Sequence, residues 1–245
     1  MTEFLFRDDS YAAECDARIV AVNERGGIVL DRTVFYATSG GQPGDRGSIT
    51  GESGDIAIAT AVYDEGKAEV IHVPAEAQAQ LRPGMAARAV LDWNMRYAHM
   101  RAHTALHLLC SLVKFPVTGG QIAADGGRLD FDIPDPSAVN RETIEAELNR
   151  LIRENHPVAT RYISDAELES KPELVRTMAV KPPMGSGRVR LVAIGADGEI
   201  DLQPCGGTHV RATGEIGLVT VGRLESKGKQ NRRIRVTLVP ATEGA

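Results

Sequence analysis

The stretch AARAVLDWNMRYAHMRAHTALHLLC, residues 86–110, changes its hydrophobic period at Asp92. Residues 86–92 are typical of a short strand, whereas from about Asn94 to Val113 the apolar positions recur at helical spacing. Asp92 is suited to cap this helix, and Pro116 lies just beyond its expected end. We therefore predict two domains, residues 1–91 and residues 92–245.

The segment before this boundary is typical of a small β-barrel. Short strand-like runs are separated by turn sequences such as Arg25-Gly26-Gly27 and Arg82-Pro83-Gly84. The runs span residues 17–22, 27–31, 68–73 and 86–92. Strands this short and this regularly spaced favour an antiparallel barrel.

The segment after the boundary combines helices with strands. A second helix should begin near Asn140 and stop before His156-Pro157, and Ser164 with Glu167 forms a capping-box pattern for a third. Strands are expected at residues 189–194, 200–203, 218–222 and 234–239. Helices followed by strands, rather than strict alternation, predict an α+β domain with an antiparallel sheet, and an α+β fold class for the chain.

Composition narrows the class of protein. Of the 245 residues, 42% are hydrophobic and 25% charged, which is typical of a globular protein. No apolar run approaches the ~20 residues of a membrane span, and the start, MTEFLFRDDS, carries acids where a signal peptide carries positive charge. The three cysteines are widely spaced and odd in number, so no disulfide framework is expected. We expect a cytoplasmic protein without membrane attachment.

Charge is distributed unevenly along the chain. The net charge of -5 argues against a protein that coats nucleic acid indiscriminately, because such binders depend on many phosphate contacts. Residues 223–235, RLESKGKQNRRIR, nevertheless hold six Lys and Arg against one acid, so their local charge is 6 - 1 = +5. A local phosphate-binding surface remains possible within an acidic protein.

His103 and His107 are four residues apart on the predicted helix, so both imidazoles can reach one ion. Two ligands do not complete a zinc site, and a polar seam on the helix is the alternative. The stretch DLQPCGGTHV adds Cys205 and His209, with two glycines between them that we expect to permit a tight turn. Taken alone, CGGTH is also compatible with a plain turn and a buried cysteine. The four residues together form a donor set that zinc prefers.

Neighbouring positions refine this prediction. Zinc peptidases of the His-Glu-x-x-His type keep a general base beside the first ligand, and Thr104 occupies that place here, which disfavours peptidase chemistry. His99 lies roughly 12 Å along the helix from His107 and cannot easily share its ion. We expect His99 to be a surface residue, a neighbour of the site or a phosphate contact, and His72 and His156 to be structural.

Several motifs, in matching order, resemble the editing domain of alanyl-tRNA synthetase and its free-standing relatives, the AlaX family. They are TVFYATSGGQPGDRGSI at 33–49, HTALHLL at 103–109, QPCGGTHV at 203–210, TGEIG at 213–217 and GKQNRRI at 228–234. Threonyl-tRNA synthetase editing domains share the histidine pair, but the CGGTH and SGGQP forms are similar to the alanyl branch. Ala37 departs from the proline that commonly follows Phe-Tyr in the family.

The resemblance implies a zinc-dependent aminoacyl-tRNA hydrolase of the medium-length AlaX type. Such a protein removes serine, and also glycine, from mischarged tRNA(Ala) in trans, because the two predicted domains leave no segment for an aminoacylation domain. By the same resemblance His103, His107, Cys205 and His209 bind one Zn²⁺ per chain. We expect no obligate protein partner and a monomer.

Roles for other residues follow from the same resemblance. Thr38 and Gln42 are the predicted catalytic residues, with Thr38 first in recognising the serine hydroxyl, because a site that pairs a hydroxyl discriminates better than one that measures size. The predicted substrate-binding residues are Thr38, Ser39, Gly40, Gly41, Gln42, Lys227, Lys229, Arg232 and Arg233. No general base is evident, and we expect the free ribose hydroxyl of the tRNA to assist the water.

Two other functions stay open from sequence. In the first, the zinc is structural and the protein is a non-catalytic tRNA-binding module, because four protein ligands can form a closed site. In the second, the protein is a zinc hydrolase of a different small ester or amide.

Overall fold

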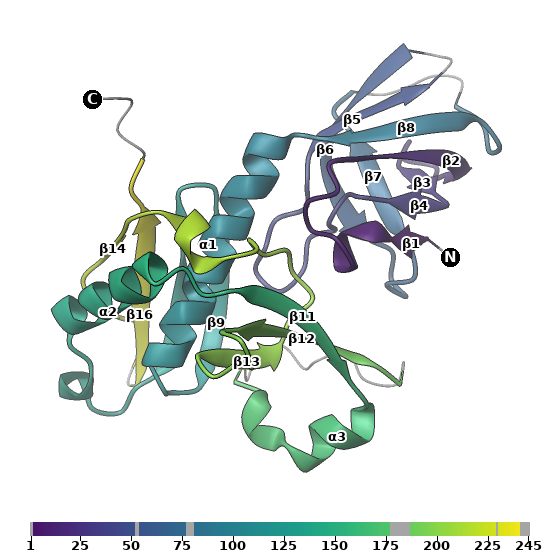
Figure 1. Ribbon diagram of the computed structural model, residues 1–245. Coiled ribbons are helices and arrows are strands. Elements are labelled where there is room, and N and C mark those ends of the chain that lie inside the picture. The colour runs from purple at the N-terminus through teal and green to yellow at the C-terminus, as the bar shows by residue number, and fades with distance from the viewer. Residues whose placement is uncertain (1, 52–53, 77–80, 177–186, 229, 241–245) are drawn as a thin grey trace. The chain divides into compact units, whose positions relative to one another are not determined.

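We describe the protein from a computed structural model covering all residues except 1, 52–53, 77–80, 177–186, 229 and 241–245 (Figure 1). The chain forms two compact units, Met1–Tyr97 and Ala98–Ala245. This division falls within helix α1 (Trp93–Leu112) rather than at residue 91, because the first turn of α1 belongs with the barrel. Arg96 contacts Asp45, and Tyr97 contacts Tyr11, all within the first unit.

The first unit contains a closed six-stranded antiparallel barrel in the strand order β2-β3-β7-β6-β5-β8. These strands are β2 (Glu14–Val22), β3 (Ile28–Leu30), β5 (Gly47–Gly51), β6 (Gly54–Tyr63), β7 (Val70–Pro74) and β8 (Ala86–Leu91). Two short strands, β1 (Glu3–Phe4) and β4 (Arg32–Thr33), pair with each other outside the barrel. The barrel predicted from sequence is therefore present.

Alternating side chains of the barrel strands make the core of this unit. In β6, Ile56 and Ile58 are buried while Ala57 and Ala59 are exposed, as the period of two requires. The aromatic core residues Phe6, Phe35 and Tyr36 pack against the same cluster. One polar residue in this interior, His72, bonds Thr33 Oγ1 through Nε2 at 2.7 Å and Ile28 O through Nδ1 at 2.9 Å.

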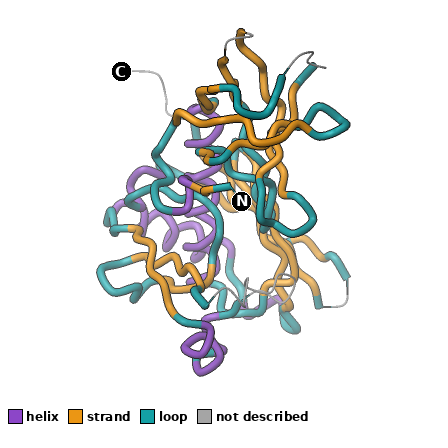
Figure 2. The backbone as a smooth tube through the Cα atoms, turned by 90° about the vertical axis from the view of Figure 1, so that its right-hand side faces the viewer, coloured by secondary structure: helices purple, strands orange, loops and turns teal. Residues whose placement is uncertain are grey.

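The second unit is built from two antiparallel sheets and the α-helices, which Figure 2 draws in purple. The larger sheet has the order β14-β16-β10-β9, with β15 also paired to β16. Its strands are β9 (Val117–Ala123), β10 (Gly126–Asp132), β14 (Val219–Val221), β15 (Glu225–Ser226) and β16 (Asn231–Leu238). The smaller sheet, β11-β12-β13, comprises Val158–Ile163, Val189–Ile194 and Asp201–Pro204. These sheets with the helices confirm the predicted α+β fold.

Two further helices have the N-caps that the sequence predicts. The α2 helix (Arg141–Arg153) begins after Asn140, whose side chain accepts from the Thr143 amide at 2.8 Å. Helix α3 (Asp165–Ser170) begins after Ser164, which forms a complete capping box with Glu167. Short 3₁₀ turns lie at Leu5–Arg7, Pro136–Ala138, Pro172–Leu174 and Thr213–Ile216. Among the described residues, no helix combines the length and apolarity needed to cross a membrane.

Helix α1 packs closely on the larger sheet of the second unit. A Cβ placed on Gly127, in β10, would come 2.8 Å from Leu106 Cδ1 of α1. The glycine therefore allows the close approach of helix and sheet. This packing places the second half of α1, which carries His103 and His107, within the core of the unit.

Candidate metal centre

Four donor side chains converge in the second unit. Nitrogen atoms of His103, His107 and His209 and the sulfur of Cys205 all lie within 4.8 Å of one another, and the three histidines are buried. Cys205 Sγ lies 3.5 Å from His103 Nε2 and 3.3 Å from His209 Nε2. These four residues, the predicted ligands, form a group that can hold a metal ion.

The other two donors, Cys205 and His209, lie in the turn that follows β13. Cys205 lies one residue beyond the strand, and Arg190 of β12 holds the turn by donating from Nη1 to Cys205 O at 2.7 Å and Gly207 O at 3.0 Å. We expected the two glycines to be needed for a tight turn, and this expectation does not hold at Gly206. That residue lacks a positive φ, and an added Cβ would meet nothing within 4 Å. Arg190, rather than a special conformation at Gly206, fixes this turn.

Hydrogen bonds orient two of the three imidazoles. Thr104 Oγ1 donates to Met100 O at 2.9 Å, so its contact with His209 Nδ1 at 3.1 Å requires an N–H donor on that nitrogen. His107 Nδ1 lies 2.7 Å from Asp201 Oδ2, where it likewise donates. Both rings thus have Nδ1 occupied, which leaves Nε2 as the donor atom toward the centre. Thr104 occupies the peptidase glutamate position and orients a ligand there.

The electrostatics of the group favour a bound cation. Burial alone would raise the pKa of the Cys205 thiol, but His103 and His209 outweigh it and hold that pKa well below its usual value. Burial holds the pKa of His209 well below its ordinary value. For His107, burial opposes the charged form, yet hydrogen bonds with Asp201 and Cys205 raise its pKa to about 10. A proton on His107 thus balances the Cys205 thiolate, and a metal ion that binds both side chains must displace that proton.

The other histidine of this helix is buried. His99 is 4% exposed, so the expectation of a surface position is wrong, and it is not part of the four-residue group. His156 lies at the end of α2, where its Nε2 contacts Glu154 at 2.8 Å. The structural role predicted for His156 stays a prediction.

The glycine-rich segment of the first unit forms a tight hairpin turn. Ser39 and Gln42 pair through both backbone hydrogen bonds, at 3.1 and 2.8 Å, and Gly40 and Gly41 between them have φ values of 55° and 83°. Two successive positive φ values are the reason for the glycine pair. Thr38 is exposed, whereas the Gln42 side chain is fully buried. A catalytic role for Gln42 stays a prediction.

A buried ion pair anchors the same segment. Asp45 accepts from the Tyr36 amide at 2.6 Å and pairs with the Arg96 guanidinium, and both charged side chains are almost fully buried. Arg96 also donates to Val34 O at 2.6 Å and Ser10 O at 2.9 Å. The ends of the glycine-rich segment are therefore fixed to the start of α1.

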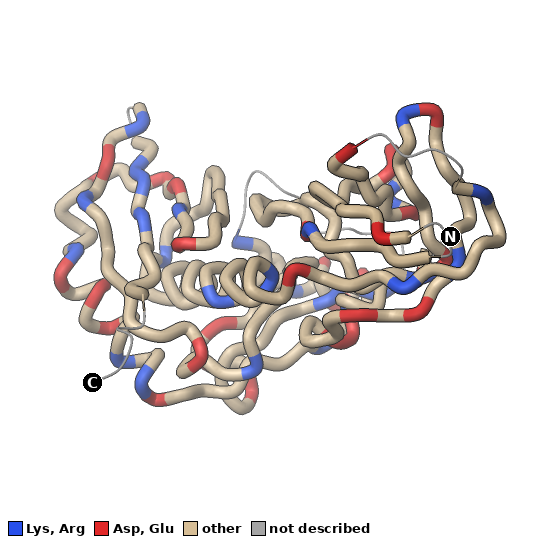
Figure 3. Tube along the Cα trace, turned by 90° about the horizontal axis from the view of Figure 1, so that it is seen from above, with Lys and Arg blue, Asp and Glu red and all other residues tan. Residues whose placement is uncertain are grey.

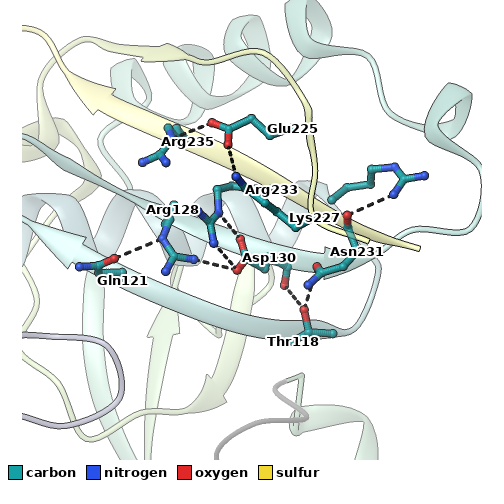
Figure 4. Close-up of polar contacts among 10 residues, drawn as sticks. Thr118, Gln121, Arg128, Asp130, Glu225, Lys227, Asn231, Arg233 and Arg235 are labelled. Carbon is teal, nitrogen blue, oxygen red and sulfur yellow. Dashed lines mark hydrogen bonds and ion pairs between the residues drawn. The ribbon is translucent and has the colours of Figure 1, made fainter. Parts of the chain in front are cut away.

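Several basic residues of the stretch 223–235 form ion pairs with acidic side chains, which the sequence does not indicate. Arg233 donates to both oxygens of Asp130, at 2.7 and 2.9 Å, and Arg128 donates to Oδ2 at 2.7 Å (Figure 4). Glu225 pairs with Arg235 at 2.8 Å and with Lys227 at 3.0 Å. The trace in Figure 3 likewise shows acidic and basic residues interspersed.

Two further basic residues, Arg232 and Lys229, were predicted to bind phosphate. Arg232 Nη1 donates to Gly228 O at 3.0 Å. Lys229 lies outside the described residues. A phosphate-binding role for Lys227, Lys229, Arg232 and Arg233 stays a prediction, and any such surface also contains the partly exposed Arg128 and Arg235.

Comparisons with known proteins agree with this arrangement. The family described as tRNA synthetases class II (A) matches residues 8–95, and the threonyl and alanyl tRNA synthetase second additional domain matches residues 189–235. The alanyl-tRNA editing protein AlaX-M of Methanosarcina acetivorans is 35% identical over 247 residues, covering 98% of this chain and 100% of that protein. The chain belongs to the AlaX-M family.

Longer relatives contain the same region. AlaX-L of Pyrococcus horikoshii is 34% identical over 97% of this chain and 58% of its own length. The alanine–tRNA ligase of Pyrobaculum neutrophilum is 33% identical over 91% of this chain and 25% of its own length. This chain therefore matches a part of each larger protein, and the resemblance inferred from its motifs is confirmed.

The matched second additional domain covers Cys205 and His209 but not His103 and His107. Three supporting residues escaped the sequence reasoning: Asp201, Gln203 and Arg190. An alternating pattern was available for the first two, since Asp201, Gln203 and Cys205 follow at intervals of two along β13 and its end. No local pattern indicates Arg190, whose side chain hydrogen-bonds the turn after β13 and Thr160 of β11.

Proposed function

We propose that this protein is a trans-editing deacylase that hydrolyses the ester of serine, and also glycine, on mischarged tRNA(Ala). The four-donor group formed by His103, His107, Cys205 and His209 carries the proposal, because it supplies a buried metal centre in a chain whose relatives are named alanyl-tRNA editing proteins. An aminoacyl ester is already activated, so polarisation and positioning provide much of the required rate increase.

The donor set fits zinc. One thiolate and three imidazoles are ligands of the types that zinc prefers, and two of the imidazoles are held by Nδ1 hydrogen bonds that present Nε2 to the centre. We propose one Zn²⁺ per chain, held by these four residues. Bound zinc supplies Lewis acidity for an ester carbonyl or a water molecule.

The residues around the centre supply orientation rather than an obvious base. Asp201 is buried, and its Oδ2 already accepts from His107. Thr104 is committed to Met100 and His209. We therefore propose that the free ribose hydroxyl of the tRNA assists the attacking water. A tRNA lacking that hydroxyl should be deacylated much more slowly, and deacylation at the full rate would contradict this proposal.

Thr38 is our candidate for recognising the serine hydroxyl. Its own hydroxyl accepts from the Gly44 amide at 2.9 Å and donates to Ala61 O at 3.2 Å. One lone pair remains on the oxygen, so it can accept a hydrogen bond from a serine side chain and not from alanine. Loss of serine preference in Thr38→Val, with retention in Thr38→Ser, would support this role. Unchanged preference in Thr38→Val would exclude it.

We propose that Lys227, Lys229, Arg232 and Arg233, which lie in β16 or shortly before it in the chain, guide the tRNA acceptor end through phosphate contacts. Asp130 orients the guanidinium of Arg233, and Glu225 orients that of Arg235. This orientation reduces the conformational entropy that these side chains lose when a phosphate binds. Such contacts position the substrate without reading its sequence.

The alternative is a zinc-stabilised tRNA-binding module without catalysis, which the four protein donors favour. The two functions differ in what happens to Ser-tRNA(Ala), Gly-tRNA(Ala) and Ala-tRNA(Ala) in a deacylation assay, with metal content measured in the same preparation. We expect rapid release of serine from the wild type and from the control Cys15→Ala, a barrel cysteine, and none from folded Cys205→Ala. Release by folded Cys205→Ala equal to the wild type would contradict the proposed active centre. A wild type that binds tRNA without releasing serine would favour the module.

A further inference from the structure

Asp201 lies beside the metal centre without belonging to its four donors. It is 3% exposed, and its Oδ2 lies 2.7 Å from His107 Nδ1. The other oxygen, Oδ1, is buried and makes no hydrogen bond within the part of the chain that the structure describes. A buried carboxylate with one oxygen unpaired is costly unless a nearby positive charge offsets it.

Gln203 holds Asp201 in place. Its Nε2 donates to Asp201 Oδ2 at 2.8 Å and lies 3.2 Å from His107 Nδ1. The second distance follows from the first, because Gln203 and His107 both donate to the same carboxylate oxygen. Asp201 and Gln203 alternate along β13, so the strand presents both side chains to one face. The carboxylate orientation is therefore set by the fold before any ion binds.

The Asp201 carboxylate can balance the charge of a bound ion. A divalent ion bound by one thiolate and three neutral imidazoles keeps one positive charge inside the protein. The Asp201 carboxylate, one imidazole away, brings the sum to zero. A carboxylate that accepts from the far nitrogen of a ligating histidine also fixes the ring orientation and makes the ligand more basic.

We infer that Asp201, held by Gln203, is a positioning residue that orients His107 toward the metal and offsets the charge of the ion. This inference rests on the proposed metal centre, and it assigns to β13 a role beyond leading into the turn that carries Cys205. Asp201 acts through His107 and is not itself a ligand.

The test is zinc affinity, measured in folded metal-free protein by competition with a chromophoric chelator. We expect affinity to fall about 10–100-fold in Asp201→Asn, which keeps the shape and loses the charge, and further in Asp201→Leu. The matched control is Asp197→Asn, an aspartate on the hairpin between β12 and β13 whose side chain is 93% exposed. Its affinity should stay within about twofold of the wild type.

A second readout separates positioning from general support of the fold. Cobalt(II) in place of zinc reports ligand geometry through its visible absorption, which we expect to change in Asp201→Asn and not in Asp197→Asn. If Asp201→Asn does not fold, Gln203→Leu removes the bond that holds the carboxylate and should weaken zinc binding by several-fold with an altered cobalt spectrum.

Wild-type affinity and spectrum in a folded Asp201→Asn, or in Gln203→Leu where the former is unfolded, would overturn the inference. Because neither readout involves tRNA, absence of deacylation in the wild type would refute the proposed function alone. A wild type that binds neither zinc nor cobalt would remove the metal centre and this inference with it.

Discussion

Removing the guanidinium of Arg96 should destabilise the barrel unit strongly. Arg96→Met leaves the buried Asp45 carboxylate with the Tyr36 amide as its main remaining partner, and it unpairs the carbonyls of Val34 and Ser10. Breaking a buried ion pair on one side costs about 3–5 kcal/mol, because an uncompensated charge stays buried. We therefore expect about 3–5 kcal/mol less stability in urea unfolding of the barrel unit.

A neighbouring ion pair provides the control. Arg46 pairs with Asp92 at 2.8 Å, but its side chain is 52% exposed, so Arg46→Met should cost less than about 1 kcal/mol. Combining Arg96→Met with Asp45→Asn should cost clearly less than the two single changes added together, because the double variant buries no unpaired charge. Equal costs for Arg96→Met and Arg46→Met, or full additivity in the double variant, would refute this account of the glycine-rich segment.

Three further outcomes are expected. Burial lowers the pKa of His72 from 6.5 to about 4. The unfolded chain therefore takes up this proton first, and folding stability should fall by about 3 kcal/mol as pH drops from 6.5 to 4. Urea unfolding of His72→Gln should show a clearly weaker pH dependence, and an equal one would contradict the assignment. Gly206→Ala should leave zinc affinity within about twofold and the melting temperature nearly unchanged, since its Cβ meets open space; a large loss of either would mean that the turn does need glycine. Arg232→Glu should weaken tRNA binding and reduce its salt dependence in a filter-binding titration, whereas an unchanged salt slope would exclude a phosphate contact there.

Elements with strong local patterns were predictable from sequence. Strand β12 spans residues 189–194 as predicted, and α2 and α3 begin after the caps identified at Asn140 and Ser164. In each case a short-range rule decides the structure, either alternation or a side chain that satisfies the first amides of a helix.

Strands β9 and β10 were not predicted, because their stability depends on distant contacts. Gly119, Gly120, Gly126 and Gly127 weaken any local preference for a strand. Gly127 is present because Leu106, far away in the chain, packs against its backbone. Strand β6 was also missed, although Ile56, Ile58 and Val62 follow the period of two and favour a strand.

The candidate site likewise contains residues that the sequence predicts and contacts that depend on the fold. The four donors could be predicted because each pair keeps a fixed spacing, whereas the Nδ1 partners of His107 and His209 depend on tertiary packing. The buried position of Gln42 and the acidic partners of the basic stretch depend equally on the fold. Spacing thus indicates which residues can bind an ion, and the fold determines how they are oriented.

The most direct test of the central proposal is the rate of Ser-tRNA(Ala) deacylation as zinc is returned to metal-free protein. We predict a rate that rises in proportion to bound zinc and saturates at one ion per chain, with no activity in folded Cys205→Ala at any zinc concentration. Full deacylation by protein shown to contain no metal, or by zinc-free Cys205→Ala, would contradict a catalytic centre formed by His103, His107, Cys205 and His209.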